Sequence, residues 1–127
     1  MSDLLLDSSA WIEYLGGTKK GKEVQALIEN KRIYIIATTV AEVCSKALKD
    51  TGTIARATLA MRTRGVFLPL TFEIGEQTAH IYVKERKKKP KFGLADAQTY
   101  AAAKNMHATL ITCDHDFAKM SHAIVIA

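Results

Sequence analysis

The order of apolar and polar positions predicts short buried strands that alternate with helices. Aliphatic runs of strand length lie at 3–7, 33–36, 66–68, 108–112 and 123–126. The segments between them predict helices over 8–15, 20–31, 40–48, 54–64, 71–88 and 94–105. This alternation is typical of βαβ units, so we expect an α/β, Rossmann-like fold. Its sheet should be mostly parallel, with about four or five strands and helices on both faces.

The helix around residues 40–48 has the clearest pattern. Five apolar residues recur at helical spacing and predict one buried stripe: Val40, Val43, Cys44, Ala47 and Leu48. Glu42 lies off this stripe, so packing does not require it. The segment Thr39–Glu42 also fits a capping box, in which the Glu42 side chain accepts a hydrogen bond from the Thr39 backbone.

Acidic residues stand at the junctions between the predicted elements. They are Asp7, Glu42, Asp96, Asp114 and Asp116. Asp7 directly follows the run Leu4–Leu6, and Asp114 directly follows the strand-like run 109–113. In a doubly wound sheet, the ends of the strands and the starts of the helices that follow them share one edge. We therefore expect these acids to face one another there.

Each acid taken alone also has a structural explanation. Asp7 suits a helix cap, Asp96 suits the first turn of a helix, and Asp114 and Asp116 suit a turn. Together, however, carboxylates within about 6 Å of one another would repel by roughly 3 kcal/mol per pair at an effective dielectric near 20. Such a group must take up protons or hold a cation, and oxygen ligands without imidazole favour Mg²⁺, with Mn²⁺ as its substitute.

A carboxylate-held cation suits hydrolysis of a phosphate polymer, and the charge of the chain agrees with such a substrate. The formal net charge is +5, and the segment Lys84–Lys91 holds six basic side chains and one acidic one. A run of this kind is often only a solvated helix end, but it also attracts phosphates. Lys87, Lys88 and Lys89 are therefore candidate contacts for a phosphate polymer.

Four segments resemble the motif blocks of PIN domains, in matching order and over nearly the whole chain. They are Leu-Leu-Leu-Asp7-Ser-Ser9-Ala-Trp, Thr39-Val-Ala-Glu42-Val, Gly93-Leu-Ala-Asp96-Ala and Leu-Ile-Thr112-Cys-Asp114-His-Asp116-Phe117. The resemblance implies a single PIN domain over residues 1–127, and the compact size looks most like that of VapC-type toxins of toxin–antitoxin pairs. The implied activity is that of a metal-dependent endoribonuclease on single-stranded RNA.

The same resemblance implies roles for individual residues. The catalytic acids would be Asp7, Glu42, Asp96 and Asp114, and the metal ligands would be Asp7, Asp96, Asp114 and Asp116. Ser9 and Thr112 would be polar supports around the metal. The family also implies a homodimer, inhibited by a small antitoxin protein that lies over the active site. One departure is that Gln98 and Tyr100 are polar where family members are often more apolar.

Other functions use some of the same residues. A PIN nuclease of RNA processing, or one that cleaves DNA, would need the same acids, and an inactive PIN module would bind RNA or a protein partner. A receiver domain is disfavoured because Val66–Pro69 supplies no acceptor Asp after the third strand. A phosphatase with an Asp-x-Asp start is disfavoured because Ser8 and Ser9 follow Asp7.

The segment Gly16–Glu23 nearly spells a phosphate-binding P-loop. It fails because Glu23 replaces the Ser or Thr that would bind Mg²⁺, and because it follows a helix instead of a strand. We interpret it as a loop whose lysines, Lys19, Lys20 and Lys22, contact RNA.

The remaining composition concerns location. Cys44 and Cys113 are interpreted as buried thiols of a reducing cytoplasm. No apolar run approaches the roughly 20 residues that a membrane-spanning helix needs. A cytoplasmic protein without membrane contact is therefore expected.

Overall fold

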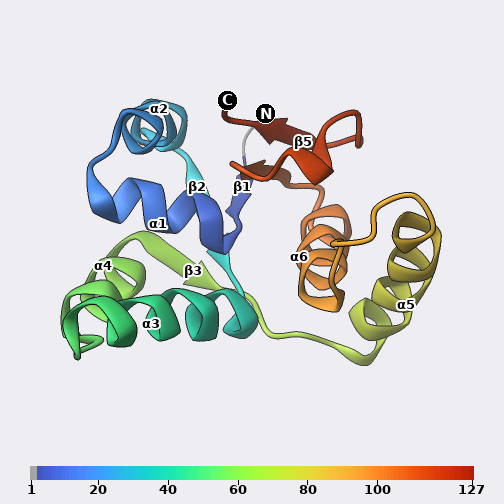
Figure 1. Cartoon of the computed structure of the whole chain (residues 1–127), viewed down its shortest axis with the longest axis horizontal. Helices are drawn as coiled ribbons and strands as arrows, with labels where there is room; N and C mark the ends of the chain where they lie inside the picture. Colours follow the sequence, from blue (N-terminus) through green and yellow to red (C-terminus); the bar gives the residue numbers. More distant parts are fainter. Residues whose placement is uncertain (1–2) are drawn as a thin grey trace.

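Short aliphatic segments pair side by side into the central sheet. The computed structural model describes residues 3–127. Its strands are β1 (Asp3–Leu6), β2 (Arg32–Ile35), β3 (Gly65–Phe67), β4 (Thr109–Thr112) and β5 (Ala123–Val125). All pairs are parallel, and the order is β3-β2-β1-β4-β5 (Figure 1). The expected α/β fold with a parallel sheet is confirmed.

Helices connect every strand to the next except β4 to β5, which are joined through a short 3-10 turn. The helices are α1 (Ser8–Gly16), α2 (Lys19–Ile28), α3 (Ala37–Thr51), α4 (Ala55–Arg64), α5 (Phe72–Arg86) and α6 (Leu94–Asn105), and the 3-10 turn is η1 (His115–Phe117). In the part of the chain that the structure describes, no helix combines the length and the apolar character needed to cross a bilayer.

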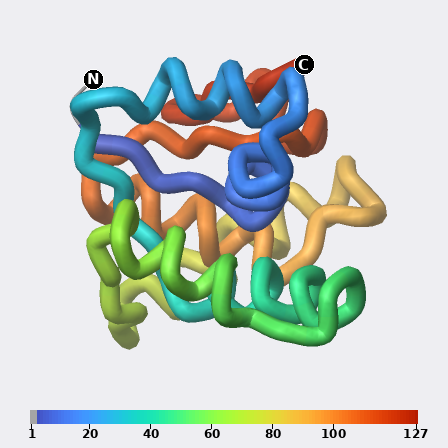
Figure 2. Tube along the Cα trace, turned by 90° about the vertical axis from the view of Figure 1, so that its left-hand side faces the viewer, coloured from blue at the N-terminus to red at the C-terminus, as the bar shows by residue number. Residues whose placement is uncertain are grey.

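The sheet separates two apolar cores. Side chains alternate across a strand, so Leu4 and Leu6 of β1 enter one core while Leu5 enters the other. The helices α1 to α4 pack on the first face, and α5 and α6 pack on the second. Seen from the side of the first face, α1 to α4 lie in front and α6 lies behind (Figure 2).

The segment Gly16–Glu23 is a helix end and a helix start, so its interpretation as a loop is wrong. The Thr18 hydroxyl caps α2 by accepting a hydrogen bond from the Gly21 N–H at 3.0 Å. Gly21 is buried against α1, where an added Cβ would lie 1.9 Å from the Glu13 carbonyl oxygen. The helix ends at Ile28, earlier than the predicted 31, and Asn30 then adopts a left-handed φ of 61°.

The capping box predicted at Thr39–Glu42 is also wrong. The helix α3 begins at Ala37, and its N-cap residue, Ile36, provides no side-chain hydrogen bond. Thr39 therefore lies inside the helix, and no cap accounts for Glu42. The buried stripe is shorter than predicted, because Val43 is 2% exposed whereas Leu48 is 52% exposed.

The cysteines differ from expectation in burial, whereas the start of α5 agrees with it. Cys44 and Cys113 are only partly buried. The Thr71 hydroxyl caps α5 by accepting a hydrogen bond from the Ile74 N–H at 3.1 Å, as the sequence predicts.

Candidate active site

Asp7 is a carboxylate held almost out of contact with water at the end of the central strand. It follows β1 directly and is 8% exposed. One oxygen, Oδ1, accepts hydrogen bonds from the Ser9 hydroxyl at 2.7 Å and from the Ala10 N–H at 3.0 Å. The other, Oδ2, accepts a hydrogen bond from the hydroxyl of Thr112 on the neighbouring strand β4. Asp7 thus caps α1 and also joins the two central strands.

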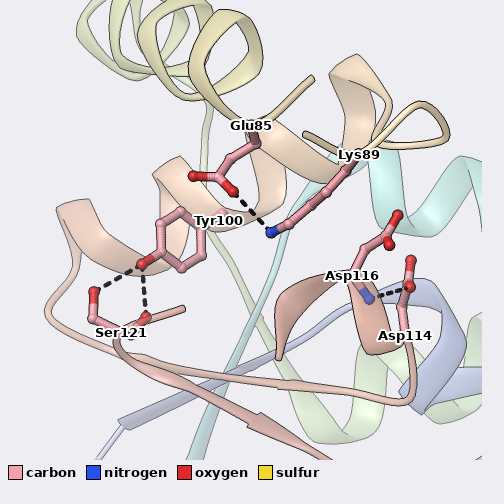
Figure 3. A network of polar contacts seen from close by, with 6 residues as sticks. All are labelled: Glu85, Lys89, Tyr100, Asp114, Asp116 and Ser121. Atoms are coloured by element: carbon pink, nitrogen blue, oxygen red, sulfur yellow. Dashed lines mark hydrogen bonds and ion pairs between the residues drawn. The ribbon is translucent and has the colours of Figure 1, made fainter. Parts of the chain in front are cut away.

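Asp114 and Asp116 lie just beyond the end of β4, which is the strand that pairs with β1. The Asp114 N–H donates to the Thr112 hydroxyl at 2.9 Å, and the Asp116 N–H donates to Asp114 Oδ1 at 2.9 Å. Figure 3 shows both side chains at the start of η1. On the other side of the turn, the Cys113 N–H donates to the Ser9 hydroxyl at 2.9 Å. Ser9 and Thr112 therefore tie this turn to the Asp7 carboxylate.

Asp96 and Glu42 reach the same edge from helices on opposite faces of the sheet. Asp96 lies in the first turn of α6, and its Oδ2 accepts a hydrogen bond from the Gly93 N–H at 2.8 Å. Glu42 lies on α3, one turn from the N-terminal end of the helix. Ser8, at the start of α1, lies near enough to Glu42 to lower its pKa, against the rise that burial causes.

The pKa values show that these acids share one site, which we call the acidic site. Burial raises the pKa of Asp7 above its ordinary value, hydrogen bonds from Thr112, Ser9 and Ala10 oppose this, and the charge of Asp114 adds to it. Burial also raises the pKa of Glu42, and the charges of Asp96 and Asp7 add to this.

Asp96 completes the set. Burial raises its pKa, the hydrogen bond from Gly93 opposes this, and the charges of Asp114, Asp7 and Asp116 raise it further. The acids predicted to converge are therefore close enough to disfavour one another's ionisation. Their convergence makes a cation the natural counter-charge, because a buried carboxylate among other carboxylates has no cationic partner of its own.

The donor set fits a hard divalent cation. Every candidate ligand is a carboxylate oxygen, which Mg²⁺ and Mn²⁺ prefer. The hydroxyl groups of Ser9 and Thr112 donate hydrogen bonds to Asp7 and fix its orientation. Between residues 3 and 127, no three His, Cys, Asp or Glu side chains stand in the arrangement of a finished metal site.

Comparison with known proteins gives the family. The sequence profile described as PIN domain matches residues 4–123, which is nearly the whole chain. The chain belongs to the PIN domain family. No curated protein matches it in sequence.

Solved structures share the fold over almost their full length. A toxin–antitoxin complex from Klebsiella pneumoniae is 25% identical with a TM-score of 0.80, and the alignment covers 98% of each chain. VapBC2 from Rickettsia felis, bound to a DNA fragment from its promoter, is 15% identical with a TM-score of 0.76 over 97% of this chain and 96% of the other. VapC20 from Mycobacterium tuberculosis, described as a Sarcin-Ricin loop cleaving toxin, is 17% identical with a TM-score of 0.72 over 93% and 95%.

The lysines of this PIN domain that were considered as RNA contacts differ in whether they also hold the protein structure together. Lys89 forms an ion pair with Glu85 at 2.8 Å and lies 5.4 Å from the centre of the Phe92 ring, so it holds the turn between α5 and α6 (Figure 3). Lys87 and Lys88 are exposed. Burial raises the pKa of the Cys113 thiol, and Lys20 lies close enough for its charge to oppose this rise. Lys20 is therefore near the turn that carries Asp114.

The two polar departures on α6 have separate explanations. Tyr100 is buried, and its hydroxyl donates to the Ser121 carbonyl at 2.7 Å, which anchors the segment before β5 (Figure 3). Gln98 forms a hydrogen bond with Thr38 of α3. Sequence analysis did not single out Thr38 or Ser8, and the polar character of Gln98 was the one signal that pointed to this contact.

Proposed function

We propose that this PIN domain is a metal-dependent endoribonuclease that hydrolyses phosphodiester bonds in single-stranded RNA. We further propose that it is the toxin of a VapBC-type toxin–antitoxin pair. The observation that carries the proposal is the acidic site, in which burial and the charges of neighbouring carboxylates raise the pKa of Asp7, Glu42 and Asp96. No cap explains Glu42, and Asp7 keeps a carboxylate in a place where burial opposes its charge.

The metal ligands in this proposal are Asp7, Asp96, Asp114 and Asp116. A bound Mg²⁺ or Mn²⁺ would bind a phosphate oxygen, lower the pKa of a water molecule and offset charge on the leaving oxygen. The chain's own contribution is to orient the ligands and to offset part of the cost of burying the Asp7 carboxylate. Hydrogen bonds from Ser9 and Thr112 favour the charged form of Asp7, because they lower its pKa.

Glu42 has a different part in this proposal. We propose that it moves a proton during hydrolysis, because its carboxylate lies near Asp7 and Asp96 but is not one of the proposed ligands. It reaches the acidic site from α3, on the opposite face of the sheet from α6 and Asp96. Substrate between these helices would meet Glu42 on one side and the ligands on the other.

Basic residues beside an acidic centre support a phosphate polymer as the substrate. The charge of Lys20 lowers the pKa of Cys113, the residue before Asp114, so Lys20 lies near the acidic site. Lys19 and Lys22 lie with Lys20 on the first turn of α2. Lys87 and Lys88 follow α5 in the segment that leads to Asp96. Such lysines attract phosphates without reading base sequence, so they would raise RNA affinity mainly at low salt.

A protein partner is supported by exposed apolar side chains at the start of α4, on α4, on β3 and at the start of α5. They are Ile54, Leu59, Val66, Phe67 and Phe72. A neighbouring hollow is lined by residues of α3, α4 and β3, among them Val40, Met61 and Phe67. We propose that a small antitoxin covers part of this surface, that the toxin is a homodimer, and that it acts in the cytoplasm on cellular RNA.

The test is cleavage of labelled single-stranded RNA by the purified protein with Mg²⁺ or Mn²⁺, compared with an Asp96→Asn variant. The asparagine side chain keeps an oxygen that can accept the Gly93 hydrogen bond, so the helix start is retained while the charge is lost. We expect a fall in rate of about 10²-fold or more, as for loss of one preorganised charge-stabilising group. Chelation by EDTA should abolish cleavage.

The matched control is Asp50→Asn, because Asp50 is an exposed aspartate at the far end of α3. Its rate should equal that of the wild type. Single-stranded DNA and duplex RNA, tested in parallel, separate the substrate classes. If wild type and Asp96→Asn are equally inert on a broad set of RNAs, the chain is a binding module instead of a nuclease.

A further inference from the structure

One side-chain contact joins the two helical layers directly beside the acidic site. The Thr38 hydroxyl donates a hydrogen bond to Gln98 Oε1, across 60 positions of sequence. Thr38 lies in the first turn of α3, and Gln98 lies near the start of α6. Both side chains are half-buried. Because α3 packs on one face of the sheet and α6 on the other, this contact links the two helical layers, and it lies on the same helices as Glu42 and Asp96.

The contact acts on the segments that carry two of the acids. Thr38 and Glu42 are four residues apart on α3, so they lie on the same side of that helix. Gln98 follows Asp96 by two residues, within the same part of α6. A shift of α3 relative to α6 would therefore move Glu42 relative to Asp96.

The start of α3 lacks the usual anchor of a helix end. Its N-cap is Ile36, which has no polar side chain to accept a hydrogen bond from the first turn. Uncapped helix ends fray, because their first N–H groups have no partner within the helix. The hydrogen bond from Thr38 to Gln98 thus restrains the N-terminal end of α3, which has no side-chain cap.

We propose that Thr38 and Gln98 are positioning residues that hold Glu42 at a set distance from Asp96, so that the negative charge of Glu42, which is not itself a ligand, strengthens the binding of a cation at the acidic site. The inference rests on the proposed function, since it assigns a cation to that site. Thr38 and Gln98 touch neither cation nor substrate in this account. They act through the relative placement of α3 and α6.

The test uses the dissociation constant of Mn²⁺, measured by titration of the purified full-length protein. Thr38→Val removes the hydroxyl and keeps the shape of the side chain, whereas Thr38→Ser keeps the hydroxyl. Gln98→Met keeps the length of the side chain and removes the hydrogen-bonding amide. We expect Mn²⁺ binding about fivefold weaker in the Thr38→Val and Gln98→Met variants, which corresponds to one ordinary hydrogen bond, and near wild type in the Thr38→Ser variant.

The double variant, Thr38→Val with Gln98→Met, distinguishes a shared contact from two unrelated effects. If the residues act through their mutual hydrogen bond, the double variant should bind Mn²⁺ as weakly as either single variant. Multiplied losses would overturn the inference. So would single variants that bind Mn²⁺ like the wild type.

A second measurement needs no metal. Amide hydrogen exchange of the metal-free protein should be faster over the first turns of α3 in Thr38→Val, and unchanged in Thr38→Ser. Equal exchange in the two variants would overturn the positioning role. A wild-type protein that binds no Mn²⁺ and cuts no RNA would instead overturn the proposed function. The effect of Thr38 and Gln98 on cation affinity would fall with it. The exchange data test the contact between the two residues independently of any metal.

Discussion

Replacing Thr112 by Val removes one hydroxyl from the centre of the acidic site and leaves the shape of the side chain unchanged. Thr112 is completely buried. Its hydroxyl donates to Asp7 Oδ2 and accepts from the Asp114 N–H at 2.9 Å. The variant therefore leaves a buried carboxylate with one donor fewer and a backbone N–H without its acceptor.

The expected loss follows from those two bonds. A hydrogen bond to a charged group contributes about 1.5–3 kcal/mol, and an ordinary one contributes about 1 kcal/mol. We expect Thr112→Val to lower the free energy of unfolding by roughly 2–4 kcal/mol at neutral pH. For a domain of this size the melting temperature should fall by about 10 °C.

The loss should depend on pH in a stated direction. Burial raises the pKa of Asp7 above its value of 3.8 in the unfolded chain, and Thr112 lowers it part of the way back. Removing Thr112 raises the folded-state pKa further. Stability linked to a raised folded pKa is fully present below 3.8 and is lost as pH rises through the folded pKa. The variant should therefore approach wild type in acid and fall behind it as pH rises.

The assay is thermal and urea unfolding in EDTA, from mildly acidic to neutral pH, with Thr99→Val as the matched control. Thr99 is also buried, but its hydroxyl bonds only to the Ala95 carbonyl of its own helix. Thr112→Ser should restore most of the lost stability. A Thr112→Val loss no larger than that of Thr99→Val, or one that grows in acid, would refute this account of Asp7.

Three further outcomes are expected. Asp7→Asn should abolish RNA cleavage without lowering the melting temperature in EDTA. The reason is that Asn keeps the helix cap and removes a charge that burial and neighbouring carboxylates disfavour. A clear drop in melting temperature would instead support the role of Asp7 as a cap. Gly21→Ala should destabilise by about 2 kcal/mol or more in urea unfolding, since its Cβ would collide with backbone, whereas Gly75→Ala, on an open helix surface, should be neutral or slightly stabilising. Changing Lys87 and Lys88 together to Ala should weaken RNA binding and reduce the salt slope by about two at most, and an unchanged slope would mark them as solvated surface only.

The sequence was sufficient to predict the sheet and the position of the acids. Aliphatic runs such as Leu4–Leu6 have strand length and are buried on both faces, and the carboxylates that follow them fall at one edge by topology alone. Asp7 and Asp114 were therefore expected near each other. Asp7 was also expected to cap a helix and Asp114 to shape a turn, and the structure shows Asp7 as the cap of α1 and Asp114 as the cap of η1.

The errors arose where tertiary contacts decide the local structure. The helix α3 starts at Ala37 with no polar cap, so nothing in the local sequence marks its beginning, and Thr39 was mistaken for the cap. The start of α2 at Lys19 had a local signal, Thr18, but the glycines around it outweighed that signal. Gly21 is required there because α1 approaches closely, which no local pattern reveals.

The contact between Thr38 and Gln98 lies beyond any local signal. The two residues are 60 positions apart, and their meeting depends on how two helical layers pass over the sheet. The same holds for the ion pair of Lys89 with Glu85, which withdraws one lysine from a run that looks uniformly solvated in sequence.

The bond between Asp7 and Thr112 spans 105 positions, so the chain must be translated as far as Thr112 before it can form. The ribosome makes the N-terminal part first. Until β4 is synthesised, β1 can pair with β2 on one side only. If the proposed nuclease function holds, incomplete chains should therefore lack it. Chains released before residue 109 should neither bind Mn²⁺ nor degrade RNA, and assays of such truncated products would show whether this delay exists.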